Sequence, residues 1–339
     1  GRSYLLLFSF PILLRATPTE VSKVLRMLFW ICFITSILYI LQVLVVRGPI
    51  MPYPGQPSID PSTGLVRMHN PPANLIVFLA LSFLCPAFLP QKLNLNLVRC
   101  IFFVALICNL GRTAIATGIF MVLLALFMNG SFKKIGGAII IIGILALPFV
   151  GTISNRFEEG GTSNDFNEIM KGNFGDNYVN DGDATMLYRF AWCYERADYL
   201  VKRPIGERIF GMGLCSDSQD WVTKKYNFTL GLPNKEMGRI QQLTTPDISF
   251  GNMITGLGFV GTVVYLVFYY YLALYFWKRR KCNIFFLLMS AYTLILIAIA
   301  FAGSNLSEVR TFSLMFLIIS LAFHPNGKGI MAFDKSKIE

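Results

Sequence analysis

The stretch LVRCIFFVALICNLGRTAIATGIFMVLLALFM, residues 97–128, decides how the rest of the chain is arranged. It is mostly apolar, but the pair Gly111-Arg112 interrupts it near its middle. The stretch is either one long helix or two shorter helices, Leu97–Leu110 and Thr113–Met128, that turn back on each other. An arginine in the middle of a spanning helix would cost roughly 3 kcal/mol, which favours the hairpin.

The distribution of basic residues supports the same choice. These residues are Arg15, Lys23, Lys92, Arg99, Lys133, Lys134, the run Lys278-Arg279-Arg280-Lys281, Lys328, Lys335 and Lys337. If the chain turns at Gly111, all of them fall on one side of a membrane, which is the cytoplasmic side by the positive-inside rule. One long helix would place the basic clusters before and after it on opposite sides. We therefore predict the hairpin.

Composition indicates a membrane protein. The chain has 339 residues, of which 54% are hydrophobic and only 14% charged, more apolar than the core of a soluble domain requires. The net charge of +11 comes mostly from short loops between apolar runs, which is not the pattern of a nucleic-acid-binding surface. We expect membrane lipid, and no nucleic acid, as a partner.

Apolar runs predict an all-α polytopic membrane protein with about nine transmembrane helices. The expected helices are Tyr4–Leu14, Val24–Val46, Asn74–Pro90, Leu97–Leu110, Thr113–Met128, Ile135–Ile153, Met253–Trp277, Asn283–Ala302 and Thr311–Phe323. The first run is too short to span comfortably, so we expect an N-terminal part of the protein to precede it. The expected divisions are N-terminal helices (1–153), a large periplasmic loop (154–252), C-terminal helices (253–323) and a cytoplasmic tail (324–339).

The large loop contains one predicted amphipathic helix. Apolar residues recur at helical spacing over Ala184–Val201, opposite a polar face with Arg189, Glu195 and Arg196, and Pro204 follows. We expect this helix to lie near the membrane surface, and the glycines after it to form a flexible, turn-rich stretch.

Three arginines are expected beside helix ends on the outer side, where the positive-inside rule predicts few cations. They are Arg67, Arg112 and Arg189. Arginine binds phosphate oxygens in bidentate fashion, so several arginines at a bilayer surface are suited to a lipid pyrophosphate. The alternative is that each one snorkels or pairs with an acid such as Glu158 or Asp183.

Asp247 precedes the long apolar run at Met253–Trp277, at the outer side. A carboxylate there is suited to act as a general base, although an aspartate at a helix start is commonly an N-cap. His69 is the imidazole of the outer loops, and a histidine in such a loop is more often structural than catalytic. Gly256, Gly258 and Gly261 have a small-residue spacing that helix packing explains.

Metal and nucleotide chemistry are not expected. The cysteines and the two histidines form no ligand pattern, and only Cys193 and Cys215 are candidates for a disulfide. A metal held by carboxylates alone stays open. Because no nucleotide-binding motif occurs, we predict no cofactor.

The order of these motifs resembles the bacterial O-antigen polymerase and ligase (Wzy-like) membrane proteins. The resemblance covers most of the chain but each motif is loose. Its elements are Arg67 with Asn70, Pro71 and Asn74; Gly111-Arg112; Arg189 with Trp192; Pro204 with Gly206, Gly211 and Gly213; and Asp247 with Gly258 and Gly261.

The resemblance implies polymerisation of undecaprenyl-pyrophosphate-linked oligosaccharide repeat units into O-antigen or capsular polysaccharide, at the periplasmic face of the bacterial inner membrane. Asp247 would be the catalytic base, and Arg67, Arg112, Arg189, His69 and Asn74 would bind pyrophosphate or glycan. A chain-length regulator is an implied partner. The ligase branch carries a histidine where this chain has Pro246-Asp247, which favours the polymerase. The alternatives are an O-antigen ligase and, from another class, a lipid-linked oligosaccharide flippase.

Overall fold

The computed structural model describes most of the chain outside the large loop and the two ends. The described residues are 11–12, 15–51, 58–59, 64–68, 71–90, 93–147, 185–213, 215, 219–226, 228, 230, 232–234, 239–243, 248–300, 303, 306 and 310–323. The chain divides into two compact units. Unit 1 comprises Gly1–Arg156, Leu272–Ile295 and Val309–Glu339, and unit 2 comprises Phe157–Tyr271 and Leu296–Glu308.

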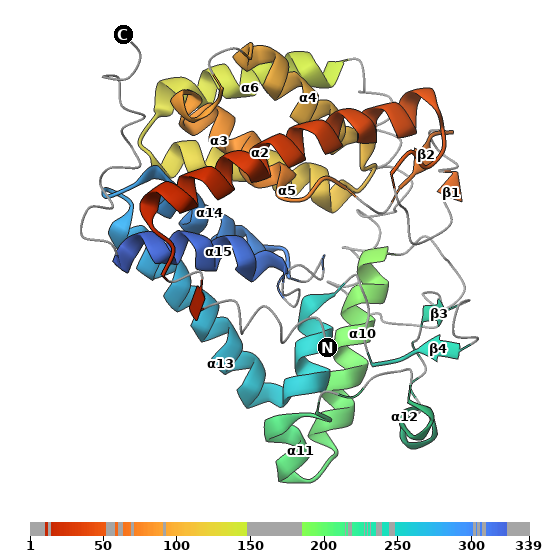
Figure 1. Ribbon diagram of the computed structural model, residues 1–339. Coiled ribbons are helices and arrows are strands. Elements are labelled where there is room, and N and C mark those ends of the chain that lie inside the picture. The colour runs from red at the N-terminus through yellow and green to blue at the C-terminus, as the bar shows by residue number, and fades with distance from the viewer. Residues whose placement is uncertain are drawn as a thin grey trace. The chain divides into compact units, whose positions relative to one another are not determined.

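The described residues are mostly helical, as predicted (Figure 1). In chain order the elements are α2 (Pro18–Ile40), the π-helix η1 (Leu41–Val45), β1 (Ser58–Ile59), β2 (Val66–Arg67), α3 (Leu75–Leu84), the 3-10 helix η2 (Pro86–Phe88), α4 (Leu95–Cys108), α5 (Arg112–Met128), α6 (Phe132–Ala146), α10 (Thr185–Val201), α11 (Ile205–Phe210), α12 (Asp220–Lys225), β3 (Leu232–Asn234), β4 (Arg239–Gln241), α13 (Ser249–Arg279), α14 (Ile284–Ala298), α15 (Arg310–Ser320) and η5 (Leu321–Phe323). The strands form only two short antiparallel pairs, β1 with β2 and β3 with β4.

The stretch at residues 97–128 forms two helices, α4 and α5, so the hairpin prediction is confirmed. Leu110 in the connection has a φ of 53°, which reverses the chain direction. Close packing follows at Gly118, because a Cβ at that position would lie 2.3 Å from Cδ2 of Leu106. Glycine therefore lets α5 return directly against α4.

Helix boundaries follow local chemistry. Thr17 and Glu20 form a capping box at the start of α2, with Pro18 in the first helical position. The Asn94 side chain accepts hydrogen bonds from the Asn96 and Leu97 amides and so caps α4. The run expected at Asn74–Pro90 is helical only to Leu84, because the residue before a proline avoids the helical region and Pro86 follows.

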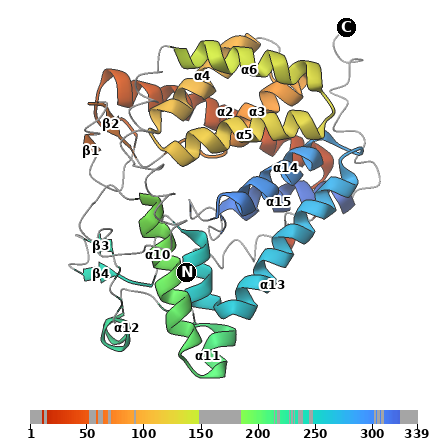
Figure 2. The same ribbon diagram turned by 180° about the vertical axis from the view of Figure 1, so that it is seen from behind.

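Aromatic contacts hold the helices of unit 1 together. The Phe29 ring of α2 meets Phe78 of α3 at 5.8 Å and Phe102 of α4 at 5.9 Å, both edge-on. Farther along, Cys108 at the end of α4 packs in one cluster with Tyr39 and Val43 at the end of α2 and η1. The helices α2 and α4 therefore run parallel, with α2–α6 gathered into one bundle in both views (Figures 1 and 2).

Two helices within the described residues are long and apolar enough to cross a membrane. They are Pro18–Val45, with 28 residues, and Ser249–Arg279, with 31 residues. Four shorter apolar helices are α3, α4, α5 and α14. The run expected at Tyr4–Leu14 lies almost wholly outside the described residues.

Large apolar side chains are exposed along one side of several helices. On α13 they begin with Val260 and continue to Leu274, and Val264 is 62% exposed. Similar exposed residues occur on α2, including Ile34, and on α6, including Ile140. Contiguous exposed apolar surface of this kind is unusual for a soluble monomer and is typical of contact with lipid or another protein.

Unit 2 contains α10, α11, α12 and the first part of α13. One buried cluster joins Leu200 of α10 to Val222 of α12 and to Met212, which follows α11. A second cluster joins Trp192 of α10 to Ile248 at the start of α13. Both clusters include residues of α10, so this helix connects the other elements of the unit.

Candidate functional site

One end of unit 1 is built from elements distant in sequence. The Tyr39 hydroxyl donates a 2.8 Å hydrogen bond to the carbonyl of Met68, and both residues are fully buried. Val43, Val66 and Cys108 pack around this contact. It therefore joins the end of α2 to β2 and to the end of α4. We call this end of unit 1 the arginine end.

The structure brings two of the predicted arginines to the arginine end. Arg67 is half-buried in β2, between the buried residues Val66 and Met68. Arg112 is the first residue of α5 and follows the end of α4 after a connection of three residues. Asn74 precedes α3, whose last turn contacts the first turn of α4 through a bond from Arg99 to the Ser82 carbonyl. Asn74 therefore lies toward the same end.

Unusual backbone conformations gather at the arginine end. Among the described residues, the non-glycine residues with positive φ are Arg47 (52°), Asn74 (61°) and Leu110 (53°). Each one costs about 1–2 kcal/mol and persists only where the surrounding structure fixes it. Such residues cluster at functional sites, so this end of unit 1 is the strongest candidate site by backbone geometry.

Sequence reasoning missed Gln42, which lies inside the π-helix η1 and is fully buried. Single π-helical turns occur frequently at functional sites. The Gln42 carbonyl accepts a 3.1 Å hydrogen bond from the Gly48 amide, just after η1. The available signal was a glutamine inside an otherwise apolar run. Arg47, which is exposed, follows η1 and adds a third cation to the arginine end.

Acidic residues are scarce in unit 1. Glu20 is its only carboxylate among the described residues, and it begins α2 at the other end of the bundle. No described acid of unit 1 therefore accompanies Arg67. The acids considered as pairing partners, Glu158 and Asp183, lie outside the described residues.

The opposite end of unit 1 carries the basic loop residues. Arg99 stacks on the Phe83 ring at 4.3 Å, and Phe88 of η2 meets Phe285 of α14 at 5.2 Å. These contacts bring the run at residues 278–281 to the end where α4 begins. Lys133 and Lys134 begin α6, which returns from α5 at the same end. Within unit 1, the arrangement expected from the hairpin is thus present.

In unit 2, Arg189 lies half-buried on α10. One turn later, the buried Trp192 packs against α13 at Gly251, where a Cβ would lie 2.7 Å from Cδ1 of the indole. Tyr188 contacts the same indole, with ring centroids 5.9 Å apart. Arg189 is therefore carried by a helix that is tightly fixed to the start of α13.

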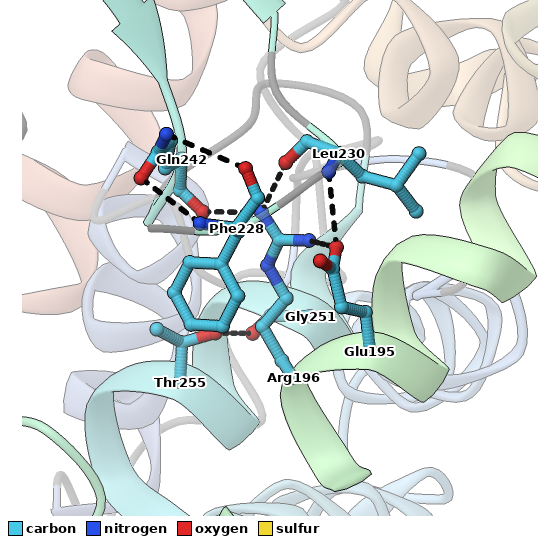
Figure 3. A network of polar contacts seen from close by, with 7 residues as sticks. All are labelled: Glu195, Arg196, Phe228, Leu230, Gln242, Gly251 and Thr255. Carbon is cyan, nitrogen blue, oxygen red and sulfur yellow. Dashed lines mark hydrogen bonds and ion pairs between the residues drawn. The ribbon is translucent and has the colours of Figure 1, made fainter. Parts of the chain in front are cut away.

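Arg196 corrects the predicted amphipathic pattern of α10. It was expected on the polar face, but its side chain is fully buried between the rings of Trp192 (3.6 Å) and Phe228 (4.3 Å). Its guanidinium donates to the carbonyls of Leu230 and Gln242 and pairs with Glu195 at 2.5 Å (Figure 3). The segment after α12 covers this face, which helical periodicity alone does not reveal.

The same network extends through backbone contacts. Glu195 also accepts a 3.1 Å bond from the Leu230 amide, and the Gln242 side chain bonds both backbone groups of Phe228 (Figure 3). By contrast Tyr194, whose spacing matches the predicted apolar face of α10, is 60% exposed. Arg196 therefore holds the segment at residues 228–242 on α10, which is a structural role.

Asp247, His69 and Asn70 lie outside the described residues. The start of α13 nevertheless bears on the N-cap alternative. A cap at position 247 would accept from the amides of Ser249 and Phe250. Both amides already donate to the Ala300 carbonyl, at 3.0 and 3.2 Å, and Ser249 also donates to Gly303. These carbonyls supply the acceptors that a capping side chain would provide.

The spacing of Gly256, Gly258 and Gly261 predicted a packing stripe on a continuous helix, but Gly258 does not have this role. Its φ of 68° and ψ of −173° break α13. A Cβ on Gly258 would lie 2.5 Å from the Ile209 carbonyl oxygen, and one on Gly211 would lie 2.8 Å from the Thr255 carbonyl oxygen. The turn after α11 enters the break, where the Met212 amide bonds the Thr255 carbonyl at 2.8 Å. The predicted flexible stretch is instead α11 and a fixed turn.

The described part of the chain also bears on metal binding and on the candidate disulfide. It contains no group of three or more His, Cys, Asp and Glu residues suited to a metal ion. Cys193 and Cys215 are free thiols in two different clusters. The candidate disulfide is therefore absent.

Comparison with known proteins gives no relatives. No family model, no curated protein and no solved structure matches this chain. The residues and their geometry are therefore the basis for any functional conclusion.

Proposed function

We propose that the chain is a multi-pass inner-membrane glycosyltransferase that polymerises undecaprenyl-pyrophosphate-linked oligosaccharide repeat units into O-antigen or capsular polysaccharide. The observation that carries the proposal is the arginine end of unit 1. There Arg67 and Arg112 lie toward the same end of an apolar bundle, opposite its basic end. A lipid-linked pyrophosphate presents two phosphates at the same level of a membrane, where paired arginines bind them well.

Membrane insertion is supported by exposed apolar surface and by charge. The exposed side chains of α2, α6 and α13 need an apolar environment, and α2 with η1 and α13 are long enough to span. The basic end of unit 1 faces the cytoplasm by the positive-inside rule. The arginine end then faces the periplasm.

The proposed reaction needs charge stabilisation and a base. The hydroxyl of the acceptor repeat attacks the anomeric carbon of the growing chain, forming a new C–O bond as the bond to undecaprenyl pyrophosphate breaks. Asp247 takes the hydroxyl proton, and Arg67, Arg112 and Arg189 neutralise the departing pyrophosphate, with His69 and Asn74 contacting phosphate or glycan. Since pyrophosphate is a good leaving group, the reaction is proposed to need neither metal nor nucleotide.

The start of α13 supports the role of Asp247. The Ser249 and Phe250 amides are bonded to backbone carbonyls of Ala300 and Gly303, so a capping side chain is not required there. We therefore propose the role of general base for Asp247 rather than the role of N-cap. The start of α13 packs against Trp192 of α10, the helix that also carries Arg189.

A flippase is the second candidate, because a broken spanning helix is typical of transporters and α13 is broken at Gly258. The break lies near one end of α13. The roughly 20 residues that follow it extend about 30 Å and are sufficient to cross the hydrocarbon core alone. Transporter sites lie near the midplane, so the position of this break favours the polymerase.

The test is glycan profiling of a strain that lacks the gene for this chain, complemented with wild type, Arg67→Ala or Arg112→Ala. Loss of a charge-assisted contact costs about 1.5–3 kcal/mol, which predicts roughly 10- to 100-fold slower polymerisation and a shortened glycan ladder. Lys133→Ala is the matched control, since Lys133 is an exposed cation at the opposite end of unit 1. Its ladder should equal that of wild type.

Three outcomes would reject parts of the proposal. Normal ladders from both arginine variants, at equal expression, would remove the arginine end from the site. Accumulation of lipid-linked polymer with no transfer to the acceptor in the deletion strain would indicate a ligase, whose base would be sought at His69. Accumulation of single lipid-linked repeats on the cytoplasmic side would indicate a flippase.

A further inference from the structure

A short helix in unit 2 exposes apolar side chains beside the break in α13. Ile205 and Phe210, at the two ends of α11, are 73% and 72% exposed, and Val201 at the end of α10 is 53% exposed. At about 100° per residue, Ile205, Ile209 and Phe210 occupy one arc of about 140° on this helix. Glu207 and Arg208 lie outside that arc.

The contact between Gly211 and Gly258 fixes where α11 lies along α13. A Cβ on Gly258 would lie 2.4 Å from the Gly211 amide nitrogen and 2.6 Å from the Ile209 carbonyl carbon. The C-terminal end of α11 therefore touches the break itself. Both views show α11 beside the bend of α13 (Figures 1 and 2).

The exposed apolar face of α13 begins immediately after this break. Val260 is 49% exposed, Val263 59% and Val267 59%, and the helix ends in the cations Lys278 and Arg279. If α13 crosses a membrane, the break lies at the boundary between lipid tails and headgroups, because roughly 20 residues separate it from the cationic end. The apolar arc of α11 then lies at that boundary too.

Cations border the apolar residues of α11. Lys202 is exposed and pairs with Asp198 at 2.6 Å, while Arg208 is exposed and donates to the Arg203 carbonyl at 2.6 Å. An apolar arc with basic residues at its edge is the pattern of a helix that lies in the membrane interface, near lipid phosphates.

We propose that α11 is a membrane-interface anchor, in which Ile205 and Phe210 insert at the headgroup–acyl boundary of the leaflet where the lipid-facing part of α13 begins. The anchor holds unit 2 at the bilayer surface through the Gly211–Gly258 contact. It rests on α13 crossing the membrane and not on glycosyl transfer, so it can fail or succeed independently of the enzymatic activity.

The test uses spin labels in proteoliposomes of phosphatidylethanolamine and phosphatidylglycerol. Ile205→Cys, Phe210→Cys, Arg208→Cys and Val264→Cys are made separately in a chain whose seven native cysteines are replaced by alanine. Labels at 205 and 210 should be more accessible to oxygen, which partitions into lipid, than to a water-soluble nickel chelate. The label at 208, off the apolar arc, should show the reverse preference.

The label at Val264 reports whether α13 lies in the membrane. It therefore distinguishes failure of the anchor from failure of α13 to cross the membrane. Oxygen preference at 264 together with nickel preference at both 205 and 210 would overturn the anchor while leaving the spanning helix intact. Nickel preference at 264 would overturn both. Because the two α11 positions are exposed and tested independently, a single poorly folded variant does not decide the result.

Discussion

Gly211 and Gly258 contact each other backbone to backbone: a Cβ built on either residue would lie 2.4 Å from the amide nitrogen of the other. Both have positive φ, 74° for Gly211 and 68° for Gly258. The first ends α11 and the second breaks α13. The contact therefore fixes the turn after α11 in the break of α13, and both positions require glycine for conformation and for space.

Alanine at Gly258 or Gly211 should destabilise the protein. Positive φ costs a non-glycine residue about 1–2 kcal/mol, and the clash with backbone atoms adds to that cost. We expect a clearly lower melting temperature in detergent for each variant, measured by tryptophan fluorescence. Gly206→Ala is the control, since a Cβ there meets nothing within 4 Å. Equal melting temperatures for Gly258→Ala and Gly206→Ala would contradict the geometry.

Replacing Arg196 by Met should lower the free energy of unfolding by about 3 kcal/mol, because it leaves the carbonyls of Leu230 and Gln242 without their donor. Denaturant unfolding monitored at Trp192 measures the change. Lys202→Met is the matched control, since its ion pair with Asp198 is exposed, and it should leave stability unchanged. Near-wild-type stability of Arg196→Met would show that the segment at residues 228–242 is held by other contacts.

Asp247→Asn separates a catalytic base from an N-cap. Asparagine caps helices about as well as aspartate but does not accept a proton at neutral pH. We expect unchanged melting temperature with loss of the long glycan ladder. Asp247→Ala should lose the ladder equally and also retain stability, because Ala300 and Gly303 already bond the Ser249 and Phe250 amides. A full ladder from Asp247→Asn would exclude the base assignment.

The Cys193 thiol should be unreactive in the folded protein at pH 8. Burial raises its pKa from 9.0 to about 11, and the nearby Arg196 charge acts in the opposite direction. Because the folded-state pKa is raised, the thiol favours the folded state fully below pH 9, and this contribution falls as pH rises toward 11. Maleimide counting by mass should show modification at the exposed Cys282 first, and at Cys193 only after unfolding. Rapid labelling of native Cys193 would contradict its burial.

Side-specific labelling tests the proposed topology. Cys282, beside the basic run at residues 278–281, should react with a membrane-impermeant maleimide only from the cytoplasmic side. A thiol introduced by Lys224→Cys on α12, in a Cys282→Ser background, should react only from the periplasmic side. Spheroplasts and inverted vesicles provide the two orientations. Labelling of both sites from the same side would overturn the proposed crossing of α13.

Much of the fold was predictable because its signals are local. Apolar runs located α2, α4, α5, α13 and α14, and the placement of basic residues selected the hairpin over a single helix. The Thr17–Glu20 capping box and Pro86 set boundaries through neighbouring backbone groups. For the candidate site, the sequence supplied Arg67 and Arg112 as residue types suited to phosphate.

The rest was decided by contacts between distant segments. Helical periodicity assigned Arg196 to a polar face. The segment at residues 228–242 covers this face, and periodicity within α10 holds no information about that segment. Spacing suggested a packing role for Gly258, while the break depends on Gly211, 47 residues earlier. The burial of Gln42 within a π-helical turn beside the arginine end was likewise not visible in the sequence. The sequence by itself determined which long apolar segments are helical and which end of unit 1 is basic, because both depend on residues within a few turns. Only the tertiary structure decided which polar groups are buried together. Their burial depends on contacts between segments far apart in the sequence, which no local pattern shows.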